Sequence, residues 1–180
     1  MQTLCLRRSP LWNRAVGFTP TRVICIDVLH SLYLGTLHKF SREALWFMFE
    51  IGCWGRCSSV ETYKTAVFSL RSCLFNWYKT PRGEGLTCLH DLTTKMLGSF
   101  GDHKLKSKAM ETWGVLLFLC DMLRQHRPLC GQRGAVFLEA GMLLQHYVDL
   151  IKAGGYNLEP AALQDHEIIF RLGDRKLLTW

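Results

Sequence analysis

The sequence pattern changes from extended to helical within the stretch Arg22-Val-Ile-Cys-Ile-Asp27-Val-Leu-His30-Ser-Leu-Tyr-Leu-Gly35. A short β-branched run ends there at a carboxylate, and a helical pattern begins. The β-branched run predicts one short extended segment. Because one strand cannot form a sheet, its pairing partners are either missing from the chain or supplied by another one. We therefore expect that a protein partner could complete the fold around residues 22–27.

A long helix is predicted to follow this stretch. Apolar residues recur there at steps of three and four, as on one face of an α-helix, at Tyr33, Leu37, Phe40, Ala44, Met48 and Ile51. The glycines of residues 52–55 should end this helix. Ser58, with Glu61 three residues later, has the pattern of a capping box, so the next helix should start there and run to about Tyr78.

The second half of the chain also predicts helices. A short one is expected over residues 89–97, and two long ones over 105–125 and 134–152, separated by Pro128 and Gly131. The short connection makes the two long helices antiparallel neighbours at the centre of the fold. A last helix should begin at Pro160.

These patterns predict an all-α fold, a single bundle of about five to six helices. We place an irregular lead-in at 1–21, the helical domain at 22–173 and a tail at 174–180. A length of 180 residues with 48% hydrophobic and 21% charged residues is typical of one globular domain. No apolar run is long enough for a membrane span, and the first ten residues lack the order of a signal peptide, so we expect an intracellular protein with no membrane partner.

The eight cysteines are scattered through apolar segments, which predicts free core thiols rather than a disulfide framework. Cys53 and Cys57 form the one closely spaced pair. A structural zinc site needs four ligands that usually arrive as two such pairs. We therefore expect no zinc.

Positive charge is concentrated in the first 110 residues. Basic and acidic residues number seven and three in 1–60, eight and four in 61–110, and seven and eight in 111–180. A basic excess of this kind suits a polyanion such as nucleic acid, because Lys and Arg contacts to phosphate supply most non-specific affinity. A solvated basic surface without a partner is the alternative.

Three lysines, Lys104, Lys106 and Lys108, are expected to open the helix over 105–125. Cations are disfavoured at the positive end of a helix dipole, so their presence there suggests either an anion or solvent beside them. A helix N-terminus with three lysines would form a phosphate site. A hydrated turn is the other interpretation.

Asp27 and His30 are the candidate metal ligands, because a carboxylate and an imidazole three residues apart can share a metal if the turn between them is helical. The alternative is a capping Asp and a His that forms a core hydrogen bond. No phosphate-binding glycine loop, nucleophile elbow or zinc-protease motif is present. Enzyme activity therefore has no support from the residues themselves.

Several segments resemble open reading frames of transposon origin in dinoflagellate and other protist genomes: Phe18-Thr-Pro20, Cys25-Ile-Asp27-Val-Leu-His30 through Gly35, Leu45-Trp46, and Leu105-Lys-Ser-Lys108-Ala-Met-Glu111-Thr. The Asp-x-x-His element is similar to one that follows the second catalytic aspartate in DDE/D transposases of the hAT and CACTA-like groups. In those families it opens a helical insertion in an RNase H-like core. The resemblance implies that residues 31–172 are such an insertion domain.

The chain departs from that family pattern in its acidic residues. Only 26 residues precede Asp27, so the first catalytic aspartate cannot be placed on a strand upstream of it. No glutamate lies in a sequence context that matches the last catalytic acid of the family. The resemblance therefore implies a catalytically inactive fragment that associates with DNA, in the nucleus, through its basic N-terminal half. We expect no cofactor, since Mg²⁺ or Mn²⁺ would be held only if the ancestral site were intact. The alternative is a helical protein-interaction module with no nucleic-acid role.

Overall fold

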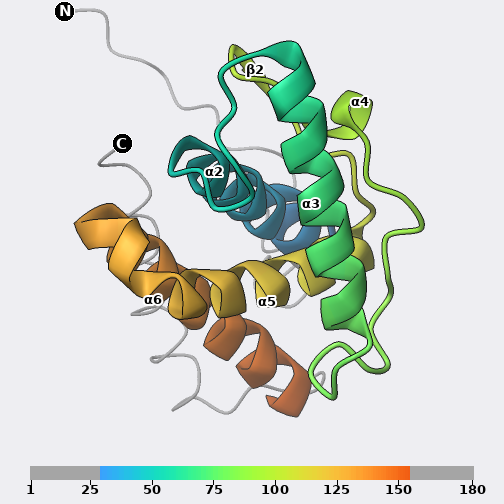
Figure 1. The fold of residues 1–180 in the computed structure, drawn as a ribbon. Coiled ribbons are helices and arrows are strands. Elements are labelled where there is room, and N and C mark those ends of the chain that lie inside the picture. The colour runs from blue at the N-terminus through green and yellow to red at the C-terminus, as the bar shows by residue number, and fades with distance from the viewer. Residues whose placement is uncertain (1–28, 155–180) are drawn as a thin grey trace, which may run out of the picture.

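The structure is a computed structural model that describes residues 29–154. In this part of the chain one π-helix and five α-helices surround a core, with a single small β-hairpin (Figure 1). In chain order the elements are η3 (Leu29–Leu37), α2 (His38–Glu50), α3 (Val60–Tyr78), α4 (Thr94–Leu97), β1 (Gly98–Ser99), β2 (Asp102–His103), α5 (Ala109–Gln125) and α6 (Arg127–Gly154). The predicted all-α fold is confirmed. The lead-in, the extended segment at 22–27, the helix from Pro160 and the tail lie outside the described residues.

Helix α2 is enclosed by other elements over its C-terminal half. The six residues 44–49 are all buried, so this helix is covered on every side rather than on one face. The predicted face is confirmed from Tyr33 to Met48, with Ile51 partly buried at its end. The π-helical turn η3 joins α2 without a break and also contacts α5. A helix apolar all round must be enclosed by others, and α3, α5 and α6 form that enclosure.

The expected antiparallel pair is present as α5 and α6. Near one end of the pair, Lys152 Nζ of α6 lies 4.6 Å from the ring centroid of Trp113, which is close to the start of α5. Near the middle, α6 passes so close to α5 that a Cβ added at Gly141 would collide with Cys120 Sγ. Glycine is therefore needed at this crossing, because any side chain would force the two helices apart.

The boundary predicted between these two helices is a break inside α6. Gly131 has φ 56° and ψ −157°, which is non-helical backbone. A positive φ is accessible to glycine at little cost, so the chain can turn here after one short helical turn that begins at Arg127. Beyond the break, the Phe137 ring packs on Phe40 and Phe47, with centroids 6.1 and 5.1 Å apart, and so ties α6 to α2.

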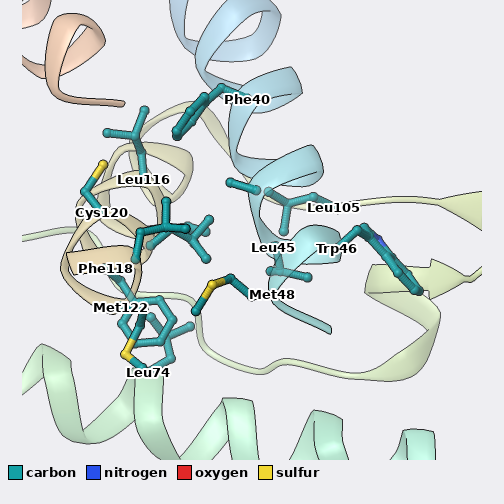
Figure 2. Packing of buried hydrophobic residues seen from close by; sticks show 14 of the residues in the cluster. Phe40, Leu45, Trp46, Met48, Leu74, Leu105, Leu116, Phe118, Cys120 and Met122 are labelled. Atoms are coloured by element: carbon teal, nitrogen blue, oxygen red, sulfur yellow. The ribbon is translucent and has the colours of Figure 1, made fainter. Parts of the chain in front are cut away.

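Hydrophobic side chains from three helices meet in the core. Figure 2 shows Phe40, Leu45 and Met48 of α2 in the cluster that also contains Leu116, Phe118 and Met122 of α5 and Leu74 of α3. Trp46, also a member of the cluster, points away from these residues, toward the hairpin (Figure 2). Helix α2 thus has the main core on one side and the hairpin on the other.

The cap of α3 lies one residue later than predicted. Ser59, not Ser58, is the N-cap: its Oγ accepts from the Thr62 N–H at 3.2 Å, and Thr62 Oγ1 accepts from the Ser59 N–H at 2.8 Å. Glu61 instead lies in the first turn and pairs with Lys64. The prediction was wrong because threonine also completes the reciprocal pair, and Ser59 has the extended backbone that a cap requires.

The two serines give a matched test of this cap. We expect Ser59→Ala to lower the free energy of unfolding by about 0.5–2 kcal/mol, because it leaves the Thr62 N–H without its acceptor. Ser58→Ala should leave stability almost unchanged. Urea denaturation of both variants makes the measurement, and a larger loss for Ser58→Ala would contradict the cap observed here.

Two predicted helices are shorter than expected. The helix over 89–97 is confined to α4, and the helix predicted over 105–125 begins at Ala109. Leu89, Leu92 and Leu105 are nevertheless buried, so they reach the core from non-helical backbone. Spacing alone cannot distinguish such positions from helical ones.

Within residues 29–154, no helix combines the length and apolar content needed to cross a bilayer.

Candidate nucleic-acid interface

The chain between α4 and α5 is held in an extended conformation. Strands β1 and β2 pair Gly98 with His103 and Ser99 with Asp102, and the hairpin carries Phe100 at its tip. Beyond the hairpin, the Lys104 N–H donates to Leu97 O at 2.8 Å and the Lys106 N–H donates to Met96 O at 2.9 Å, and both acceptors belong to α4. Backbone hydrogen bonds therefore fix the path of the segment that leads into α5.

The three lysines form a row on the outer side of this segment. Lys104, Lys106 and Lys108 are exposed, whereas Leu105 between them is only 3% exposed and Ala109 is buried. Side chains alternate along extended backbone, and alternate residues lie about 6.6 Å apart. We call Lys104, Lys106 and Lys108 the lysine row. All three side chains are exposed to solvent, and the Lys104 ammonium lies beside the Asp102 carboxylate.

The lysine row is anchored to helix α2. The His38 Nε2 hydrogen-bonds to Leu105 O, and Trp46 Nε1 donates to Lys104 O at 3.4 Å. The His103 ring also stacks on Trp46, with centroids 4.3 Å apart and planes inclined by 4°. Since Trp46 is fully buried on α2, this backbone is held against the buried part of that helix.

A carboxylate, that of Glu111, already lies in the first turn of α5. Lys108 is the N-cap, and Glu111 Oε2 accepts from the Lys108 N–H at 2.7 Å. The Thr112 hydroxyl donates to Lys108 O and also contacts the Ser107 hydroxyl. The lysines thus precede the helix instead of opening it, and the Glu111 carboxylate places a negative charge in its first turn, where the helix dipole favours one. A phosphate beside the lysines would be bound mainly by their ammonium groups.

Most of the charge in the lysine row is not neutralised by neighbours. Lys104 pairs with Asp102, and both side chains are largely exposed. No described residue forms an ion pair with Lys106 or Lys108. An exposed pair contributes only about 0–1 kcal/mol, so a phosphate can compete for Lys104 as well. All three lysines can therefore contact a polyanion at once.

An open cleft of about 400 Å³ lies beside the hairpin, at the C-terminal end of α2. It is lined by Phe49, Glu50, Ile51, Gly52, Arg56, Cys57 and Phe100, and we call it the aromatic cleft. Arg133 Nη1 donates to Glu50 Oε2 at 2.7 Å, which neutralises that carboxylate. Arg56 is exposed and has no ion pair among the described residues. Most of the surface that lines the cleft is polar, Phe100 is its exposed aromatic side chain, and Arg56 adds an unneutralised cation.

The cysteines near the aromatic cleft have no nucleophilic character. Burial raises the pKa of Cys53 to about 12, with Cys130 and Cys73 adding to the effect, and burial also raises the pKa of Cys57. Both thiols are therefore protonated at neutral pH, and the thiolate is the reactive form. The described cysteines are free, as predicted, and Cys120 and Cys130 lie in the core. The prediction of a core position was wrong for Cys73 and Cys88, which are exposed.

The structure brings the three lysines together, but describes only half of the candidate metal pair. His30 lies exposed in the first turn of η3, and Asp27 lies outside the described residues. Within residues 29–154, no group of three or more His, Cys, Asp or Glu side chains could hold a metal ion. The metal role of Asp27 and His30 remains a prediction.

Sequence reasoning missed the hairpin and the aromatic residues around it. The signal was present in Gly98-Ser-Phe100-Gly101-Asp102, where two glycines flank an apolar residue, as in a tight turn. Gly98 has φ 86° and an added Cβ there would collide with Asp102 O, so glycine is required for the strands to pair.

Comparison of the chain with protein-family models, curated proteins and solved structures gave no significant match.

Proposed function

We propose that this domain binds nucleic acid through the phosphate backbone, with the lysine row as its main contact. The observation that carries the proposal is the alternation of buried and exposed residues along 103–109, which places three lysines on the exposed side of backbone anchored to α2. Contacts of this kind position a polyanion without reading its sequence. The domain would therefore bind many sequences with similar affinity.

Filter binding at increasing salt concentration tests this function. Each phosphate contact releases counterions, so the logarithm of the association constant should fall linearly with the logarithm of salt concentration. Three lysine contacts alone should give a slope of roughly −2 to −3. No retention of single-stranded or duplex DNA, even at low salt, would contradict the proposal.

We further propose that the domain derives from the helical insertion domain of a DDE/D transposase and is catalytically inactive. The resemblance around Asp27 and His30 supports this origin, and the mostly helical region that follows His30 agrees with it. A nuclear location would follow from that ancestry. Nicking of DNA that requires Mg²⁺ or Mn²⁺ and is lost in Asp27→Ala would overturn the inactive assignment.

A protein-interaction module is the second candidate function, and α3 provides the observation that favours it. Phe68 is 66% exposed and Val60 is 69% exposed, although both belong to a helix whose other face is core. Exposed apolar side chains on one helix are compatible with a protein partner. This function alone would remain if the filter-binding experiment showed no retention.

A further inference from the structure

The ring of Phe100 is held in place while much of it faces solvent. It contacts Trp46 edge-on with centroids 5.1 Å apart and Tyr63 with centroids 6.0 Å apart. Its side chain remains 46% exposed and forms one wall of the aromatic cleft. An apolar ring exposed at a hairpin tip loses hydration on contact with a flat ligand, and its position needs little further ordering.

The aromatic cleft lies next to one end of the lysine row. Trp46 links the two, because it contacts the Phe100 ring and also donates a hydrogen bond to Lys104 O. Beyond Lys104, the chain continues through Lys106 to Lys108. Helix α2 lies beside this segment, because His38 at the start of the helix hydrogen-bonds to Leu105 O. The order along this surface is therefore cleft, Lys104, Lys106 and Lys108.

We infer that the aromatic cleft accepts an unstacked nucleobase from a single strand whose phosphates follow the lysine row. This inference rests on the proposed function and adds the class of nucleic acid. Single-strand sites combine a cationic track with aromatic rings on which bases stack. Arg56 provides a cation on the cleft side, and the volume of about 400 Å³ is within the usual range for small-ligand sites. A base paired within a duplex presents no free face to Phe100, so single strands should bind more tightly.

Substitution of Phe100 tests the inference. We expect Phe100→Leu, which keeps apolar bulk but loses the aromatic face, to weaken binding of an oligodeoxythymidine of about a dozen nucleotides by roughly 5- to 150-fold. Binding of a duplex of the same length should be unchanged. Phe100→Tyr should retain the parent affinity, because its ring can still stack. Phe68→Leu is the matched control, since it alters a ring on α3 that is even more exposed than Phe100.

The outcomes separate this inference from the proposed function. If Phe100→Leu binds the oligonucleotide as tightly as the parent, while substitution of the lysine row weakens it, the cleft holds no base and phosphate binding stands. If thymidine monophosphate binds as tightly as the oligonucleotide, the cleft holds a free nucleotide and the strand inference is overturned. If the parent binds neither nucleic acid, both proposals fail. Equal thermal midpoints for parent and Phe100→Leu would show that a loss of binding is not a loss of fold.

Discussion

Leu116→Ala is expected to lower the free energy of unfolding by about 2–5 kcal/mol. Leu116 is completely buried on α5, within the cluster drawn in Figure 2. Its truncation removes apolar contacts and leaves a cavity that α2 and α5 cannot close without moving. Urea denaturation should show a lower midpoint with little change in slope, since both variants expose similar surface on unfolding.

Leu129→Ala provides the matched control for this variant. Leu129 has the same side chain but is 65% exposed in the first turn of α6. Its truncation should change stability by less than about 0.5 kcal/mol. Equal losses for the two variants would contradict the packing of α5 at the centre of the bundle.

The helical fold could be predicted because apolar spacing sets which residues can be buried together. The steps of three and four from Tyr33 to Met48 correctly identified η3 and α2 as one continuous helical stretch. The same steps missed that α2 is enclosed on every side. The run Ala44-Leu-Trp-Phe-Met-Phe49 contained that signal, since a helix apolar all round must be buried.

The candidate site could be predicted only in part. Its three lysines were identified from sequence, but their backbone was expected to be helical. Leu105 fits the apolar spacing of α5, yet the hydrogen bonds from Lys104 and Lys106 to residues 96–97 hold it in an extended segment. These hydrogen bonds join the segment to α4, and the local apolar spacing of the sequence does not predict them. The stacking of His103 on Trp46 joins residues far apart in sequence and was likewise beyond prediction.

Replacement of the lysine row with glutamine, in the triple variant Lys104→Gln, Lys106→Gln and Lys108→Gln, is expected to remove most of the nucleic-acid affinity at physiological salt. Each lost contact should reduce the salt slope by roughly 0.7–0.9, and the triple variant by roughly 2–3. Folding should change little, because the side chains are exposed and the Lys104–Asp102 pair contributes at most about 1 kcal/mol.

A second triple variant controls for net charge. Lys64→Gln, Lys79→Gln and Lys152→Gln remove the same three charges from exposed positions on α3, just beyond its end, and on α6. This variant should keep nearly the parent slope, because these lysines lie outside the extended segment. A loss equal to that of the lysine row would mean that diffuse charge, not the row, binds the phosphates.

The salt slope of single-strand binding, compared between the parent and the lysine-row variant, tests the central claim most directly. The claim is that three lysines aligned on anchored, extended backbone contact successive phosphates. We predict that the parent slope is steeper by roughly 2–3 units. Parallel lines for the two proteins, at equal thermal stability, would contradict the claim.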